Sequence, residues 1–246
     1  MTVTNHLSRS LAALACAVAL TGSAAVAAAQ STEHLDLARD LVAQLRAQGE
    51  AGLFFDEQGV EYNRYGAAWS GSFITFGQPA YAHAVCSNFY IRLMMAAYPG
   101  WTAKGAGFAG SSPNSATLHD AIEAGACGYA RVTDFAQAQP GDVLVIKYLD
   151  GGSNSGHTML LDGATPAQVL ANGTVRWSVK VIDCSSGVHS QDTRVFPGYT
   201  STGVGSGYLN VYTFGGAITG YSWSQSNGSK IYGPAARHLT VGRITF

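Results

Sequence analysis

The hydrophobic pattern of this chain changes at Pro140, and the change limits the folds that the chain can adopt. Before Pro140, apolar residues recur at helical spacing in residues 32–48, 86–98 and 112–125, with Ser112 as the expected N-cap of the third helix. After Pro140, strand-like segments follow at residues 142–149, 157–161, 175–182, 208–214, 217–223 and 239–246. Helices followed by consecutive strands predict an α+β fold with an antiparallel sheet.

The composition agrees with one compact unit. Hydrophobic residues make up 47% of the chain and charged residues 12%, which excludes intrinsic disorder and is sufficient for a substantial core. No linker interrupts residues 30–246, so we expect a single domain. The formal net charge is −1 and basic residues form no stripe, so we expect no nucleic-acid partner. Asn-Gly pairs at 172–173 and 227–228 predict hairpin turns between strands.

Residues 1–29 have the pattern of a secretory signal peptide. Arg9 precedes an apolar run at residues 11–20, and small residues lead to an A-x-A site that ends at Ala29. A membrane anchor is disfavoured, because a span needs about 20 strongly apolar residues and this stretch is mostly alanine. The expected product is a secreted or periplasmic protein without membrane association after cleavage.

Cleavage would remove Cys16 and leave three cysteines, an odd number for an oxidising compartment. One economical arrangement is a disulfide between Cys127 and Cys184, with Cys86 free for chemistry. Sequence alone does not determine connectivity, so other pairings and a link between two chains stay open.

The free cysteine lies where a thiol is easily activated. Cys86 begins a predicted helix, whose unpaired N–H groups and dipole stabilise a thiolate. His157 follows a glycine-rich loop at the start of a predicted strand and is the candidate base. Asp183 ends the next strand and could orient the imidazole. His189 and Asp192 are the alternatives for this third position.

The order of these residues resembles the NlpC/P60 and CHAP group of papain-like cysteine hydrolases. The matching segments are VCSNF at 85–89, QPGDVLV at 139–145, GHTMLL at 156–161 and VID at 181–183. The resemblance implies a papain-like domain, in which N-terminal helices with the catalytic cysteine pack on an antiparallel sheet. It implies Cys86 as nucleophile, His157 as general base and Asp183 as orienting group. The implied substrate is an amide or peptide bond, usually in peptidoglycan peptide.

Within this scheme, residues 30–50 form an N-terminal helix, residues 80–185 form the catalytic core, and residues 200–246 form a C-terminal β extension. Tyr81 and His83, just before the cysteine, are oxyanion or groove candidates, and so is His189. The chain departs from the family in several places: Val85 and Asn88 flank the cysteine where the family has aspartate and glycine. The segment between the histidine and Asp183 also carries an insertion at 164–174, and the last 45 residues have no counterpart.

Two other functions use the same residues or the same groove. One is a non-catalytic module that binds cell-wall material or another partner, and the other is a thiol acyltransferase or deamidase. The chain contains no H-E-x-x-H and no C-x-x-C sequence, so we assign no metal and no cofactor. The sequence gives no oligomeric state.

Overall fold

The computed structural model describes residues 32–246 of the protein. The predicted signal peptide at residues 1–29 and Cys16 lie outside the described residues. Between residues 32 and 246, no helix is long and apolar enough to cross a membrane.

Helices precede most of the strands, as predicted, and the fold class is α+β. The helices are α1 (Glu33–Glu50), α2 (Cys86–Ala97) and α3 (Ser115–Glu123), with 3-10 turns η1 (Trp69–Gly71) and η2 (Phe135–Gln137). The strands before Pro140 are β1 (Asn63–Tyr65), β2 (Phe73–Thr75), β3 (Tyr81–Ala84) and β4 (Tyr129–Arg131). The later strands are β5 (Val143–Tyr148), β6 (Gly156–Val169), β7 (Val175–Ser185), β8 (Val195–Phe196), β9 (Tyr199–Thr200), β10 (Gly203–Phe214), β11 (Ala217–Ser222), β12 (Ile231–Tyr232) and β13 (Arg237–Ile244).

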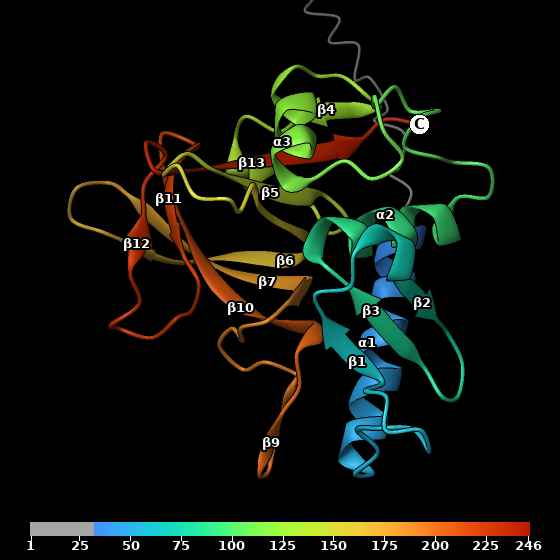
Figure 1. Cartoon of the computed structure of the whole chain (residues 1–246). Coiled ribbons are helices and arrows are strands. Elements are labelled where there is room, and N and C mark those ends of the chain that lie inside the picture. Colours follow the sequence, from blue (N-terminus) through green and yellow to red (C-terminus); the bar gives the residue numbers. More distant parts are fainter. Residues whose placement is uncertain (1–31) are drawn as a thin grey trace, which may run out of the picture.

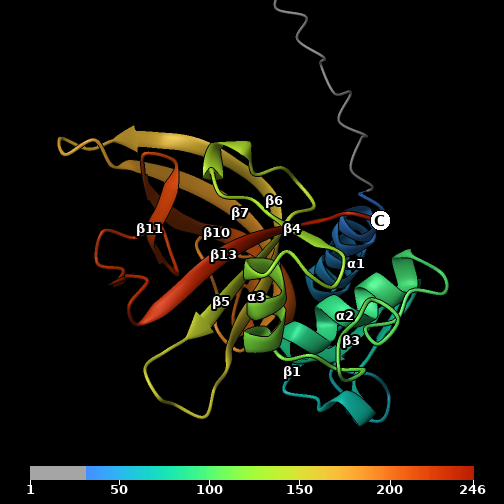
Figure 2. The ribbon, with the colours of Figure 1, turned by 90° about the horizontal axis from the view of Figure 1, so that it is seen from above.

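An antiparallel sheet of eight strands dominates the architecture, in the order β12-β11-β10-β7-β6-β5-β13-β4. A separate sheet, β1-β3-β2, precedes α2, and β8 pairs with β9. Figure 1 shows α1, α2 and the small sheet gathered on one side of the molecule, with β11 and β12 on the other. Seen from above, α3 lies over β5 and β13 (Figure 2).

The C-terminal strands belong to the large sheet. Strand β10 pairs with β7, and β13 lies between β5 and β4. The predicted β extension at residues 200–246 therefore supplies neighbours for the core strands on both sides of the β5-β6-β7 unit.

Helical periodicity explains how α1 packs. The predicted apolar stripe is buried in full: it consists of Leu35, Ala38, Leu41, Val42 and Leu45. The same core cluster includes Phe89, Leu93 and Met94 of α2 and reaches Leu160 and Ile182 of the large sheet. This shared core holds the N-terminal end of α2 against β6 and β7.

The start of α3 differs from the prediction. The N-cap is Asn114, whose side-chain oxygen accepts a hydrogen bond from the backbone N–H of Thr117 at 2.9 Å. The Ser112 hydroxyl instead donates to Oδ1 of Asn88 at 2.8 Å. Ser112 thus ties the preceding loop to α2, and the helix begins only at Ser115.

Residues 164–174, where the resemblance implies an insertion, lie in the β6-β7 hairpin. Both strands are long, with register shifts after Leu161 and Pro166. Asn172 and Gly173 form its turn, as predicted. Gly173 has a φ of 82°, and the Asn172 side chain accepts a hydrogen bond from the backbone N–H of Thr174. The Asn227–Gly228 pair lies in a longer connection between the antiparallel strands β11 and β12.

The predicted disulfide is absent from the structure. Cys86, Cys127 and Cys184 are all free. Cys184 is fully buried on β7, where its thiol donates to the carbonyl oxygen of Ala84 at 3.2 Å. Cys127 lies near Gly107, in the turn after α3. The thiol of Cys184 is therefore enclosed by the β3 side of the core, which keeps it from Cys127.

Candidate functional site

Cys86 is the first residue of α2, as predicted, and only 6% of it is exposed. Strand β3 leads directly into this position, and Val85 is the N-cap. The backbone N–H groups of a first helical turn have no partner within the helix, and the helix dipole is positive there. A negative charge on the sulfur is therefore favoured at this place.

The large sheet brings His157 and Asp183 together. Strands β6 and β7 are neighbours, with Met159 opposite Asp183, so the histidine lies two residues along the same face. The Nε2 of His157 lies 2.6 Å from Oδ2 of Asp183, and both side chains are buried. The predicted contact between these two residues is present in the structure.

The imidazole of His157 also hydrogen bonds the Cys86 thiol. Because Nε2 is engaged by Asp183, the ring offers Nδ1 to the sulfur. Burial would lower the pKa of His157, but Cys86 and the hydrogen bond to Asp183 raise it to about 10. Burial would raise the pKa of the thiol, but the adjacent His157 lowers it overall. Both shifts favour a thiolate–imidazolium pair.

Two further groups reach the thiol from β6 and α3. The Ser115 hydroxyl, on the first residue of α3, lies 3.6 Å from the sulfur and 2.9 Å from the Thr158 hydroxyl. The Thr158 backbone also hydrogen bonds the sulfur. These groups help to lower the pKa of Cys86, because each can donate to a thiolate.

More than one positively charged side chain contacts Asp183. His189 Nε2 lies 3.0 Å from Oδ2 of Asp183, and its Nδ1 lies 2.9 Å from the carbonyl oxygen of Trp223. Both of these oxygens accept hydrogen bonds, so both ring nitrogens of His189 carry protons. Burial alone would lower the pKa of His189, but the Asp183 carboxylate raises it. His189 is therefore an imidazolium that shares the carboxylate with His157.

Arg194 completes the environment of the carboxylate. Its guanidinium forms an ion pair with Oδ1 of Asp183 at 3.3 Å and a two-pronged pair with Asp192, closest at 2.6 Å. Asp192, an alternative for the third position in the sequence analysis, thus pairs with Arg194. Burial would raise the pKa of Asp183, but His189, Arg194 and His157 hold it well below its usual range. The buried carboxylate stays ionised and fixes both imidazoles.

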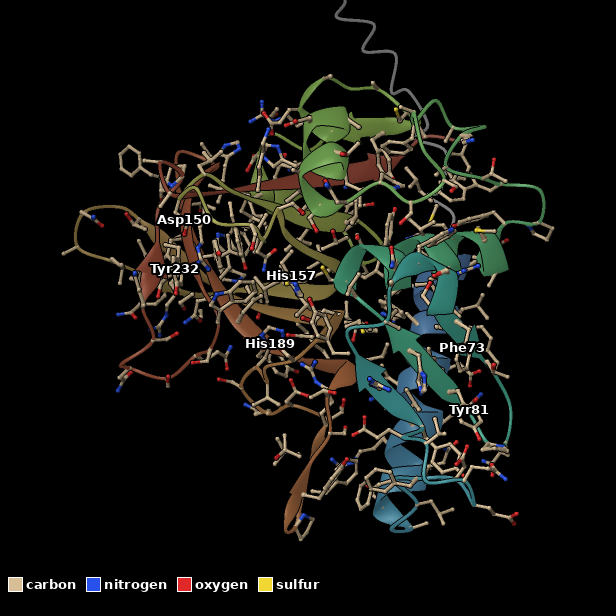
Figure 3. The ribbon with its side chains drawn as sticks, in the orientation of Figure 1. Phe73, Tyr81, Asp150, His157, His189 and Tyr232 are labelled. Carbon is tan, nitrogen blue, oxygen red and sulfur yellow. The ribbon has the colours of Figure 1, made fainter. Side chains whose placement is uncertain are left out.

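An open pocket of about 370 Å³ lies beside these residues. His157 and His189 line it, together with the aromatic side chains of Tyr65, Tyr148 and Trp223. The Trp223 ring meets the His157 ring edge-on at 5.4 Å and stacks on His189 at 5.9 Å. The two histidines lie near one another in the middle of the molecule (Figure 3). A substrate in this pocket would meet the imidazole from the solvent side.

Tyr81 and His83 do not reach this pocket. The Tyr81 hydroxyl donates to Asp56 at 3.1 Å, and Nε2 of His83 bonds the carbonyl oxygen of Glu61. Figure 3 shows Tyr81 beside Phe73, on the side of the small sheet away from His157. Strand alternation explains the difference: the face of β3 that carries these rings is opposite to the face near Cys86.

Tyr65, which the sequence did not single out, lines the pocket that Tyr81 does not reach. It ends β1 and is half-buried in the pocket lining. Burial, and then the nearby Cys86 sulfur, raise its pKa to about 12. Its hydroxyl therefore keeps its proton near neutral pH and is a hydrogen-bond donor. Its only sequence signal is its place in a tyrosine-rich segment before the cysteine.

The comparisons with known proteins give a partial similarity. No protein-family model matches the chain, and no solved structure matches it. An uncharacterized protein of Acanthamoeba polyphaga mimivirus is 30% identical to it over 133 residues, which is 48% of this chain and 58% of the viral protein. The chain thus spans little more than half the length of this relative. Because that protein is uncharacterized, any functional conclusion depends on the geometry of the site.

Proposed function

We propose that this protein is a thiol hydrolase that cleaves amide bonds through an acyl-enzyme. The observation that carries the proposal is the position of the His157 ring, which bonds the Cys86 thiol on one side and the Asp183 carboxylate on the other, at the wall of an open pocket. A nucleophile, a base and a group that orients the base are the parts that covalent acyl transfer needs.

The reaction would proceed in two halves. The Cys86 thiolate attacks the carbonyl carbon, and the oxyanion that forms faces the N–H groups at the start of α2. The His157 imidazolium then gives its proton to the leaving amine, and a thioester remains on the sulfur. Neutral His157 next takes a proton from water, which attacks the thioester and releases the carboxylic acid and the thiolate. Asp183 keeps Nε2 protonated throughout.

A peptide-like substrate suits the pocket and the resemblance to papain-like hydrolases. A cysteine at a helix N-terminus, packed on a sheet that carries the histidine and the acid on adjacent strands, is the papain-like arrangement, and the NlpC/P60 and CHAP enzymes use it on peptidoglycan peptide. The aromatic lining offers apolar surface for such a chain. A thiol acyltransferase would share the first half-reaction and differ in the acceptor that replaces water.

The test has a chemical part that requires no substrate. Cys86 should react with iodoacetamide at pH 6 faster than Cys127, and His157→Ala should remove this advantage. Mass spectrometry of the alkylated peptides measures both rates. Equal rates for the two cysteines in the wild-type protein would overturn the proposal, because no activated thiol would exist.

The second part uses muropeptides and a panel of peptides, with mass-spectrometric detection of new ends. Cys86→Ala should abolish cleavage, while Cys127→Ser, a matched change of a free cysteine away from His157, should retain it. Incorporation of ¹⁸O from labelled water into the product acid identifies hydrolysis, and its absence from an acyl product identifies transfer. Cleavage that persists in Cys86→Ala would refute the assignment of the nucleophile.

A further inference from the structure

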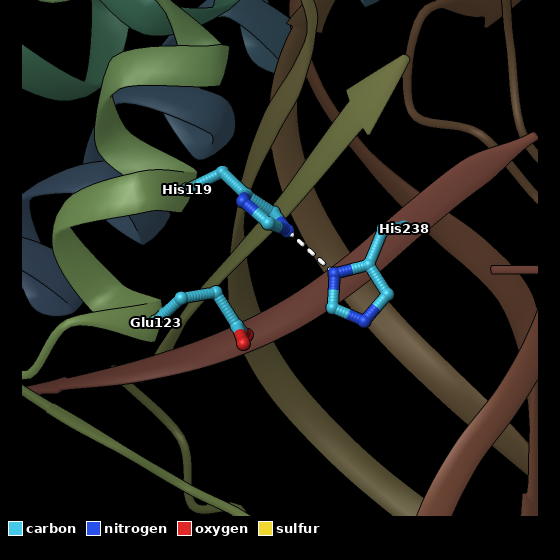
Figure 4. A group of neighbouring side chains, drawn as sticks. All are labelled: His119, Glu123 and His238. Atoms are coloured by element: carbon cyan, nitrogen blue, oxygen red, sulfur yellow. Dashed lines mark hydrogen bonds between the residues drawn. The ribbon is translucent and has the colours of Figure 1, made fainter. Parts of the chain in front are cut away.

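A second group of side chains with ligand atoms close together lies between α3 and β13. It consists of His119 and Glu123 on α3 and His238 on β13, and one ligand atom of each lies within 4.8 Å of the others. Figure 4 shows the three side chains converging, with Nε2 of His119 and Nδ1 of His238 2.7 Å apart. None of them lines the pocket beside His157.

Helical spacing directs this group toward the sheet. Ser115, His119 and Glu123 are four residues apart, so they share one face of α3. The first of them contacts the Cys86 thiol, and the other two meet His238 where β13 pairs with β5. The packing of α3 on β5 and β13 holds the two ligand-bearing elements at a set distance.

The surroundings of His119 prepare it to act as a ligand. Its Nδ1 donates to Oδ1 of Asp120 at 3.1 Å, and Lys147 holds that carboxylate at 2.7 Å. A carboxylate on the far nitrogen is the usual partner of a metal-binding histidine, because it fixes the tautomer with the lone pair on the other nitrogen.

One carboxylate oxygen of Glu123 is free to bind a cation. Its Oε2 pairs with Arg131 at 3.0 Å, whereas its Oε1 is buried and has no hydrogen-bond partner. A buried carboxylate oxygen without a partner is costly, and a cation would remove that cost. Its ligand atom lies within 4.8 Å of those of both histidines.

We propose that His119, Glu123 and His238 bind a zinc-type transition-metal dication that links α3 to β13. Two imidazoles and one carboxylate form a ligand set suited to Zn²⁺ or Co²⁺, whereas Mg²⁺ and Ca²⁺ require mostly oxygen ligands. Two nitrogens on a tetrahedral zinc are about 3.3 Å apart. The two ring nitrogens, 2.7 Å apart, need to separate by only roughly 0.6 Å as the metal takes the place of the proton between them, which moves to Nε2 of His238. A fourth position stays open to water.

The experiment is metal binding by the full chain after dialysis against EDTA. Isothermal titration with ZnCl₂ should give one equivalent per chain, and zinc at about 100 times its Kd should raise Tm by roughly 5–10 °C. MgCl₂ should do neither. His238→Ala and Glu123→Gln should each weaken zinc binding by about tenfold or more. Glu57→Gln, the same change at an exposed position, should leave it intact.

Cys86→Ala separates this site from the thiol site. It should retain the zinc equivalent, and the Co²⁺-loaded wild-type protein should lack a sulfur-to-cobalt charge-transfer band. The inference is overturned by the absence of zinc binding, by unchanged binding in both ligand variants, or by loss of binding in Cys86→Ala. It stands independently of the hydrolase proposal, because no readout involves turnover.

Discussion

Asp183→Asn tests the account of the buried charge cluster most directly. The change keeps the size of the side chain and removes its charge. It leaves His157, His189 and Arg194 facing an amide, where the carboxylate accepted bonds at 2.6 and 3.0 Å and an ion pair at 3.3 Å. The amide also presents an NH₂ group to side chains that are themselves donors.

The expected loss is large for a single isosteric change. Removing one partner of a buried ion pair costs about 3–5 kcal/mol, because the other charge remains buried without compensation. Total stabilities of about 5–15 kcal/mol leave room for the variant to fold. At about 2–4 °C per kcal/mol for a chain of this size, Tm should fall by roughly 6–20 °C.

The loss of stability in Asp183→Asn should depend on pH, and the charge of His189 determines whether it grows or shrinks as the pH rises. Its pKa in the folded wild-type protein is raised, so its contribution to stability is complete below about 6.5 and disappears as pH rises through the raised value. In the Asp183→Asn variant the carboxylate that raises this pKa is gone, burial lowers the pKa, and protonation of His189 destabilises the fold. Asp183 itself is ionised throughout this range in the wild-type protein, because its pKa is well below its usual range. The gap between the two proteins should therefore be largest at pH 5–6 and shrink toward pH 9.

Thermal unfolding followed by circular dichroism, at intervals from pH 5 to pH 9, measures this gap. Asp36→Asn is the matched control, since Asp36 forms an exposed ion pair with Arg39 at 3.2 Å that contributes about 0–1 kcal/mol. A gap of less than about 1 kcal/mol, or one that stays constant from pH 5 to pH 9, would refute the charged state assigned to His189 and the role of Asp183.

Three other changes address the thiol and its support. Alkylation of Cys86 by iodoacetamide should stay rapid below the ordinary thiol pKa of about 8.5, and His157→Ala should move its pH midpoint upward, because the imidazole that lowers the pKa is gone. Ser115→Ala should move the midpoint upward by less and lower the free energy of unfolding in urea by about 1 kcal/mol, because a buried hydroxyl pair is lost. Gly156→Ala should cost about 3 kcal/mol or more in the same assay, because Gly156 has a φ of 141° and an added Cβ would overlap the carbonyl oxygen of Ile146.

Each of these has a result that contradicts it. A midpoint near 8.5 in the wild-type protein would mean that Cys86 is an ordinary thiol. An unchanged midpoint in Ser115→Ala would exclude its hydroxyl as a donor to the sulfur. Gly163→Ala, on the same strand with open space around the added methyl, is the control for Gly156→Ala, and equal losses in both would disprove the close approach of β5.

Short-range patterns were sufficient for several parts of the fold and the site. The stripe on α1 and the start of α2 at Cys86 were predicted because helical periodicity acts among residues within two turns. The contact between His157 and Asp183 was predicted because a hairpin turn at 172–173 makes their strands neighbours. These features depend on residues that are close in the chain or joined by one turn.

The helix start at Ser112 and the Cys127–Cys184 disulfide were predicted wrongly for a common reason. Ser112 is a good N-cap residue, but its hydroxyl bonds Asn88, 24 residues away. Cys184 has a partner in Ala84, 100 residues away, that no local pattern indicates. In both cases, a hydrogen bond to a residue far away in the chain replaces the arrangement that the local sequence favours.

The amino-acid sequence alone determined the α+β class and the pairing of His157 with Asp183. Strand alternation, helical periodicity and turn residues are local properties of the sequence. Tertiary structure decided which groups surround the pair: Tyr65 in place of Tyr81, Ser115 against the thiol, and His189 on the shared carboxylate. It likewise brought together two histidines that are 119 residues apart. A strand's alternation defines two faces, but only packing against the rest of the chain decides which face meets the site.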